Sequence, residues 1–234
     1  MFQFPFILAA VVFFFLLLLL LFAFVQIGLI TVAFAKLGLT TGQAFLVLLA
    51  TLFGGGVNLP VHRSRRMIKV PSPFGPPVNS PFFRHVRPYQ FPGAAHELRE
   101  QIVAVNVGGC LIPLLLSAYF VSLMGFTPAL LLCTALVTAA CFAMAKPIPG
   151  VGIGIPMLVP PLVTAVTAIL LAPPEHAPQV AYVSGTMGTL LGADILHLFN
   201  PRTRRDLDAP VLSIGGAGTF DGIFITGILA VLLA

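Results

Sequence analysis

Two aspartates of this chain are suited to chemistry, because each stands inside a segment that is otherwise apolar. They are Asp194, in GADILHLFN, and Asp221, in GGAGTFDG. A charged aspartate at the centre of a membrane-spanning helix costs roughly 2.5–3.5 kcal/mol, so it must face the protein interior, hold a proton or be paired. Two carboxyl groups in contact share one proton, and such a pair can activate water while it protonates a leaving nitrogen. The two residues therefore predict amide-bond hydrolysis by an aspartate dyad.

Other roles for the same acids remain open. His197 follows Asp194 by three residues, on the same face of a helix, so the two side chains can form a buried ion pair or a proton relay. Arg202, Arg204 and Arg205 come soon after and can neutralise Asp194 at the membrane edge. An ion or proton pathway would use the same intramembrane acids.

Four stretches rich in glycine or proline interrupt the apolar segments. They are GGGVNLP at 54–60, VNVGGCLIP at 105–113, KPIPGVGIGIPMLVPP at 146–161 and SIGGAGTFDG at 213–222. Irregular backbone at membrane depth is tolerated where it is buried in protein or lines a wet cavity, so the stretches predict one cavity open toward the cytoplasm. Glycines that only allow close helix packing, and prolines that only kink a helix, are the structural alternative. Besides the two acids, the residues expected at this cavity are Asn58, Asn106, Pro147, Pro149, Pro156, His197, Gly216 and Gly218.

The composition indicates an integral membrane protein. Hydrophobic residues make up 58% of the 234 residues and charged residues 8%, which excludes an ordinary soluble domain. We expect an all-α fold: one polytopic transmembrane bundle over residues 1–234, with several broken or re-entrant helices on its cytoplasmic side. The first apolar run is longer than that of a secretory signal, which favours a retained helix. The seven expected segments are Phe6 to about Ala35, Ala44–Val61, Ile102–Leu123, Pro128–Ala145, Ile153–Ala172, Ala181–Phe199 and Val211–Ala234.

The lysines and arginines predict the orientation. With a cytoplasmic N-terminus, every one of them except Lys36 falls in the cytoplasmic links after the second, fourth and sixth segments. The positive-inside rule favours this arrangement over its reverse. The largest of these links is a basic, proline-rich loop at residues 62–101, which also suits contact with anionic lipid headgroups. We therefore expect a multi-pass protein of a prokaryotic cytoplasmic (inner) membrane, with lipids rather than nucleic acid as partners.

Metal and cofactor sites are not expected. Cys110, Cys133 and Cys141 lie in apolar segments without ligand spacing, and the histidines of the basic loop are scattered as well. The chain has no phosphate-binding GxxxxGK[ST] motif, and GVGIG lacks the strand-to-helix context of a dinucleotide loop. The sequence thus favours chemistry that the side chains perform unaided.

Three motifs carry a resemblance to a known family. At VNVGGCLIP, GTMGTLLGADILHL and GGAGTFDGIFITGILAVLLA, the chain resembles a prokaryotic family of polytopic membrane proteins known only as a domain of unknown function, whose C-terminal motif is GGAGTFDGIF. The resemblance extends from about Gly54 to the end of the chain. It implies a fold but no activity.

The chain is more distantly similar to the intramembrane aspartyl proteases, the presenilin and signal peptide peptidase class. That class has one aspartate on a helix that runs inward and a second after a GxG element on the next helix, and Asp194 and Asp221 match this order. The resemblance implies that they are the acid and base, with Gly216 and Gly218 as the glycine pair. The chain differs in having Ala193 where the class has tyrosine, a spacer two residues longer than in GxGD, and no PAL motif.

The function expected from these observations is that of an intramembrane aspartyl protease acting on a membrane peptide. A transporter or channel for a small solute or ion is the first alternative, because interrupted helices also form binding sites in transporters. A non-catalytic membrane scaffold is the second. The sequence does not determine the oligomeric state or the substrate.

Overall fold

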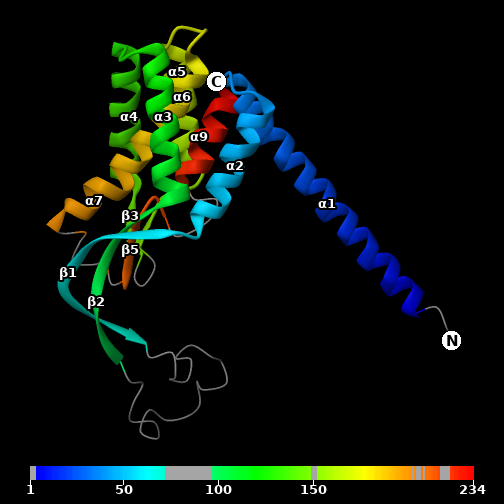
Figure 1. The fold of residues 1–234 in the computed structure, drawn as a ribbon, viewed down its shortest axis with the longest axis horizontal. Helices are drawn as coiled ribbons and strands as arrows, with labels where there is room; N and C mark the ends of the chain where they lie inside the picture. Colours follow the sequence, from blue (N-terminus) through cyan, green and yellow to red (C-terminus); the bar gives the residue numbers. More distant parts are fainter. Residues whose placement is uncertain are drawn as a thin grey trace, which may run out of the picture.

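The computed structural model describes residues 4–71, 96–148, 152–201, 203, 207, 209–216 and 222–234. Helices form a bundle, and the strands gather at one end of it, which we call the strand end (Figure 1). The opposite end, where the C-terminus lies, is called the far end. Most of the described chain is helical, in agreement with the sequence.

The first helix, α1 (Phe4–Lys36), joins the bundle only near its C-terminal end. Val12 to Leu21 are exposed along it, whereas Ala33 and Phe34 are buried against the last helix, α9 (Gly222–Leu233). The Lys36 ammonium donates to the carbonyls of Leu232 (3.0 Å) and Val231 (3.4 Å) at the end of α9. A cation at a helix C-terminus is favourable, so this contact fixes the end of α1 to the far end of the bundle.

Helix α2 (Thr41–Gly55) begins at a capping box, in which the Thr40 hydroxyl and the Gln43 side chain each bond the other residue's backbone N–H. The remaining helices are α3 (Ile112–Met124), α4 (Pro128–Met144), α5 (Val159–Leu171) and α6 (Ala177–Thr189). Helix α6 is almost entirely buried and packs against α3, α4, α5 and α9. Its small residues allow this, because Gly185 lies against α5 and α9 while Gly188 lies against Val137 of α4.

Two π-helical turns adjoin this bundle. The turn η2 (Val107–Leu111) precedes α3, and η3 (Leu190–Ile195) follows α6 and leads into the single turn α7 (Leu196–Phe199). Such turns are frequent at functional sites. The predicted segment Ala181–Phe199 therefore exists as three consecutive helical pieces, which begin four residues earlier than predicted.

The strands are the main departure from the expected all-α fold. Strands β1 (Asn58–Pro71) and β2 (His96–Asn106) are antiparallel, and β5 (Val211–Ile214) lies parallel to β2 at the edge, in the order β1-β2-β5. A second pair is β3 (Lys146–Ile148) with β4 (Gly152–Gly154). The ends of the loop predicted at 62–101 are thus strands, while residues 72–95 lie outside the described residues.

Four predicted membrane segments must be corrected accordingly. The second ends at Gly55 rather than Val61, and the third becomes helical only at Val107. The fifth begins in β4 and is helical from Val159, and the seventh begins with β5 and is helical from Gly222. Glycines end α2, and the β-branched residues Ile102, Val103 and Val105 favour a strand at the end of β2. Pro60 is accommodated because β1 is an edge strand with a register shift at this point.

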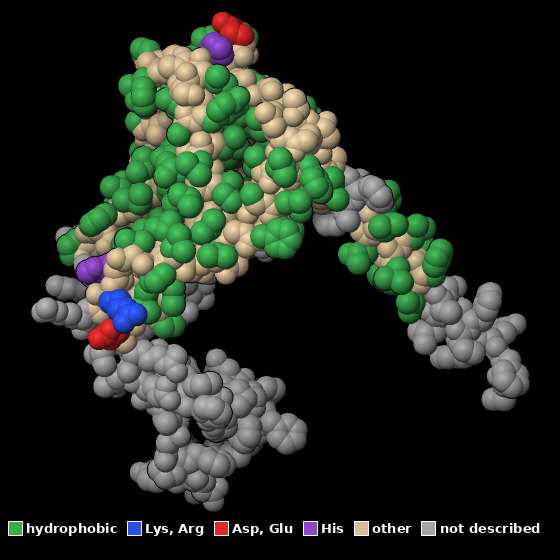
Figure 2. All heavy atoms as spheres, viewed as in Figure 1, with side chains coloured by type: hydrophobic (Ala, Val, Ile, Leu, Met, Phe, Trp, Pro, Cys, Tyr) green, Lys and Arg blue, Asp and Glu red, His purple; other side chains and the backbone are tan. Residues whose placement is uncertain are grey.

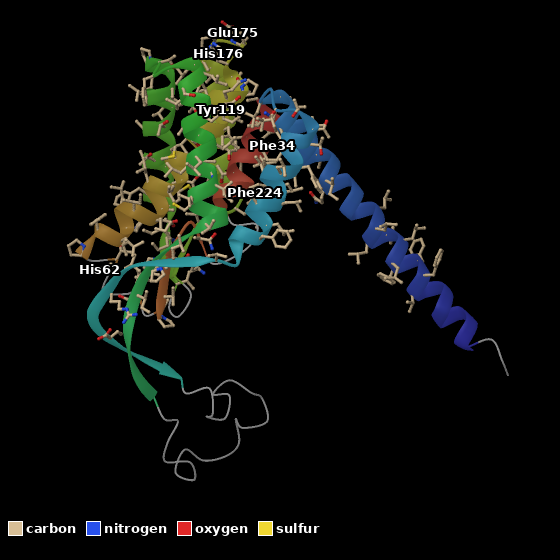
Figure 3. The ribbon with its side chains drawn as sticks, viewed as in Figure 1. Phe34, His62, Tyr119, Glu175, His176 and Phe224 are labelled. Atoms are coloured by element: carbon tan, nitrogen blue, oxygen red, sulfur yellow. The ribbon has the colours of Figure 1, made fainter. Side chains whose placement is uncertain are left out.

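Two helical stretches, Val12–Lys36 and Val107–Met124, are long and apolar enough to cross a membrane by length and composition; the other apolar helices are shorter. The face shown in Figure 2 is apolar between the two ends of the molecule, and its charged side chains lie at those ends. Figure 3 shows Glu175 and His176 at the far end and His62 at the strand end. The links between successive helices alternate between these ends (Figure 1).

Candidate functional site

Asp194 lies on η3, and its carboxylate is held by the loop that precedes α9. Its Oδ2 accepts a hydrogen bond of 2.7 Å from the backbone N–H of Gly215. Gly215 and Gly216 have φ angles of 88° and 76°, which side chains rarely permit. The two glycines let the chain turn directly after β5 and aim an N–H at the acid, and an N–H to a carboxylate is a strong hydrogen bond.

The glycine loop also packs against η2 at backbone contact. A Cβ on Gly109 would overlap the Gly215 carbonyl oxygen, and a Cβ on Gly215 would lie 2.6 Å from the backbone nitrogen of Cys110. Likewise, a Cβ on Gly108 would overlap the Thr51 carbonyl of α2. The glycines of three interrupted stretches therefore meet at one junction, where α2, η2 and the loop after β5 cross.

A chain of side-chain amides ties this junction together. The fully buried Asn106 donates from Nδ2 to the Gly55 carbonyl (2.8 Å) and to Asn58 Oδ1 (3.2 Å), and its Oδ1 accepts from the N–H of Gly109 (2.7 Å). Asn58 Oδ1 in turn lies 2.6 Å from the Ser213 hydroxyl, which is also 2.5 Å from the Gly216 carbonyl. Asn58, Asn106 and Gly216, all predicted for the cavity, are thus joined to the loop that holds Asp194.

Asp194 faces a small pocket of about 190 Å³ at the strand end. One wall is the hairpin strand β4, a second is β5, and a third is α7. The lining residues are Gly152, Ile153, Asp194, Leu198, Leu207, Val211, Leu212, Ser213, Ile214 and Gly216. Among the described lining residues Asp194 is the one charged side chain, so the pocket can hold a peptide-like group beside an acid.

Strand β5 lines this pocket and, among the described residues, forms an edge of its sheet. Pro210 O accepts a hydrogen bond from Ile102 N of β2 at 3.0 Å, so alternate residues of β5 turn toward β2 while Val211 and Ser213 turn their backbone groups the other way. On that side the Ser213 carbonyl accepts a hydrogen bond from the Gly216 N–H at 3.3 Å, so the open part of the edge is at Val211. Among the described residues, β5 pairs with no other strand. Such an edge can bind an extended peptide by main-chain hydrogen bonds.

The other predicted site residues either lie apart from the Asp194 carboxylate or fall outside the residues that the structure describes. His197 directs its ring nitrogens to the Phe142 carbonyl (3.0 Å) and the Thr203 hydroxyl (3.2 Å), which is not the pairing with Asp194 considered from sequence. Pro147 pairs with Ile153 in the β3–β4 hairpin, and Pro156 is exposed beyond it. The remaining three predicted residues, Asp221, Gly218 and Pro149, lie outside the described residues.

Several residues of the site were not predicted. Gly215 lies in the glycine-rich stretch, but sequence alone did not distinguish its N–H from that of its neighbours. Buried Gln101 donates to the carbonyls of Leu207 (2.8 Å) and Ala209 (3.1 Å) and so holds one wall of the pocket against β2. The sequence feature that could have identified Gln101 is its position directly before the apolar run of β2.

No group of three or more metal-ligating side chains occurs among the residues that the structure describes. The fold and site together define a mostly helical protein with two helical stretches long and apolar enough to cross a membrane, and with a carboxylate pocket between a helix bundle and a small sheet. A family model described as a protein of unknown function, DUF1614, matches residues 52–233, and the chain belongs to this family. No curated protein and no solved structure matches the chain.

Proposed function

We propose that the chain spans a prokaryotic inner membrane seven times, with its strand end in the cytoplasm. The seven spans are α1, α2, η2 with α3, α4, α5, α6 with η3 and α7, and α9. The alternation of the links between two ends supports this arrangement, as does the place of Lys36 at the far end, while Arg63 and Lys146 belong to strands at the other. Several helices are shorter than a typical span, and thinning of the bilayer accommodates them.

We further propose that the protein is an aspartyl protease that cleaves membrane peptides with Asp194 and Asp221. The observation that carries this proposal is the hydrogen bond from Gly215 N–H to Asp194 Oδ2, because the bonded loop leads to Asp221 within six residues. Ile223, two residues after Asp221, packs in one cluster with Leu190 and Ile195 of η3. The segments on both sides of Asp221 therefore reach η3.

The proposed reaction is an ordinary hydrolysis. The ionised carboxylate of the pair takes a proton from water, whose oxygen attacks the peptide carbonyl carbon. The protonated carboxyl gives its proton to the departing nitrogen as the C–N bond breaks, so the pair again holds one proton. The edge of β5 at Val211 would hold the peptide extended beside Asp194, because an extended chain exposes the bond to be cut.

The directions of the helices support the same class of enzyme. Helix α6 runs from the far end toward the strands and carries the first acid on η3, whereas α9 runs back from the strands directly after the second (Figure 1). Intramembrane aspartyl proteases have this order and these directions. The GGAG sequence at 215–218 takes the place of their glycine element.

The test is cleavage of transmembrane peptides by purified protein in lipid vesicles. We expect Asp194→Asn and Asp221→Asn each to lower kcat/KM at least 1000-fold, because the pair acts as a unit. Glu175→Gln is the matched control, since this acid is exposed at the far end, and it should leave the rate unchanged. Cleavage that survives either aspartate change would refute the dyad. Solute flux altered by these changes without any cleavage would favour a transporter.

A further inference from the structure

The chain that leaves α2 and enters β1 carries apolar side chains on the outside of the molecule. Phe53, near the end of α2, is 73% exposed, and Val61 of β1 is 68% exposed. Every residue from 56 to 63 is exposed as well. Such fractions exclude a place in the core. The exposed set is called the β1 surface and consists of Phe53, Val57, Leu59, Val61 and Arg63.

The first part of β1 lies across the strand end of the molecule. It runs at a large angle to the helices, and His62 marks where it reaches the side of the molecule (Figures 1 and 3). The second part of β1 and its partner β2 then extend away from the bundle (Figure 1). In the proposed orientation the helices cross the membrane, so the first part of β1 runs roughly parallel to the membrane plane.

The backbone and the side chains of β1 require different surroundings. Among the described residues β1 pairs with β2 alone, so its outer edge has N–H and C=O groups that no other strand satisfies. Unsatisfied backbone groups are costly in hydrocarbon, whereas exposed apolar side chains favour transfer out of water. Both requirements are met at the boundary between headgroups and acyl chains, where water reaches the backbone and apolar side chains enter the lipid.

Cations stand where the exposed apolar residues end. Arg63 follows Val61 by two residues and is exposed. Strand β3 repeats this combination at the same end of the molecule, since Lys146 and Ile148 are both exposed. Lysine and arginine near a membrane surface are attracted to anionic headgroups, and an arginine can pair with phosphate through two N–H groups. The apolar and cationic side chains therefore complement an anionic lipid surface.

A strand from a second copy of the chain fits this edge less well. Pro60 has no N–H, and the register of β1 against β2 shifts between Pro60 and His62 and again between Arg63 and Met67. Proline and bulges at an edge prevent another strand from continuing the sheet. The β1 surface is also continuous with the exposed apolar face of α2, which is a proposed membrane span. Lipid is therefore the partner that this surface fits.

We propose that β1 is an interfacial strand, whose apolar side chains enter the cytoplasmic leaflet while Arg63 binds an anionic lipid headgroup. The inference rests on the proposed membrane orientation and does not depend on proteolysis. It also sets the depth of the Asp194 pocket close to headgroup level, because β5 lines that pocket and belongs to the same sheet as β1.

Fluorescence quenching tests the position of β1, because the chain contains no tryptophan and a single introduced one reports its own surroundings. Val61→Trp tests the β1 surface, Leu17→Trp on exposed α1 is the control for insertion, and Glu100→Trp, on the part of β2 that extends away, is the control for water. Each full-length protein is placed in phosphatidylcholine–phosphatidylglycerol vesicles with brominated acyl chains.

We expect brominated lipid to quench positions 61 and 17 about threefold or more above position 100, because only the first two contact acyl chains. Quenching at position 17 without quenching at 61 would overturn the inference and leave the spans intact. Absence of quenching at both positions would contradict the proposed spans as well.

Lipid selectivity tests the role of Arg63. In the Val61→Trp protein, quenching by brominated phosphatidylglycerol in phosphatidylcholine, compared with the reverse mixture, gives the relative affinity of the two lipids for this site. We expect phosphatidylglycerol to be preferred about fivefold, and Arg63→Gln to abolish the preference while Arg63→Lys keeps most of it. Arg63 is exposed, so folding should persist in both variants. An unchanged preference in Arg63→Gln would refute the headgroup site.

Discussion

At the scale of single residues, Asn106 joins three chain segments through one buried amide. It bonds the end of α2 at Gly55, its own π-turn at Gly109 and Asn58 of β1. A buried amide whose partners are satisfied stabilises a structure modestly, whereas removing it leaves those partners without hydrogen bonds. The arrangement makes Asn106 a positioning residue for the loop that holds Asp194.

We predict that Asn106→Ala lowers the free energy of unfolding by about 2–4 kcal/mol, because a buried carbonyl and a buried N–H each lose a partner. Thermal or denaturant unfolding in detergent would measure the loss. Ser122→Ala is a suitable control, since this exposed hydroxyl bonds only a carbonyl of its own helix and should change stability by less than about 0.5 kcal/mol. Equal stability of the two variants would contradict the role given to the amide.

Among the elements, α2 and η2 cross at backbone contact beside Gly108. Gly108→Ala should destabilise the protein by about 1–3 kcal/mol, because the added methyl group meets backbone atoms of α2 that cannot move aside. Gly42→Ala is the matched change, since it adds a methyl in open space within α2, where alanine favours helix by up to about 1 kcal/mol. Unfolding in detergent should give a lower midpoint for Gly108→Ala than for Gly42→Ala. Similar midpoints for the two variants would show that α2 and η2 do not cross at backbone contact.

The elements also show what the sequence could and could not predict. Helix α4 was expected at Pro128–Ala145 and occupies Pro128–Met144, because a long apolar run with a proline at its start allows few other structures. The run Ile102–Asn106 was assigned to a helix and is a strand. Its parallel partner β5 is more than a hundred residues away, so local periodicity carried no sign of the pairing.

In the candidate site as well, features encoded by local sequence were predicted, whereas features that depend on distant pairing were not. The glycine-rich stretches and Asn58 and Asn106 were expected to converge, because irregular backbone in a membrane needs burial. Glycines of three of the four stretches meet at the junction together with Asn58 and Asn106, packed at backbone contact. The N–H that reaches Asp194 is set by the left-handed turn at Gly215, and the position of β5 beside it is set by strand register. No local sequence pattern specifies either feature.

At the scale of the whole molecule, the charge distribution predicts which end faces the cytoplasm. Cysteines at positions 63 and 175, introduced one at a time with the three native cysteines replaced, mark the strand end and the far end. In intact cells, a membrane-impermeant maleimide should label the Glu175→Cys variant, and the Arg63→Cys variant only after the membrane is opened. The reverse pattern would contradict the positive-inside assignment.

The pH dependence of kcat/KM for a transmembrane peptide tests whether Asp194 and Asp221 share one proton. A pair with one proton is active only between its two macroscopic pKa values, so we expect a bell-shaped profile with two carboxyl limbs. A profile with a single limb, or a bell that persists at reduced height in Asp221→Asn, would contradict the claim.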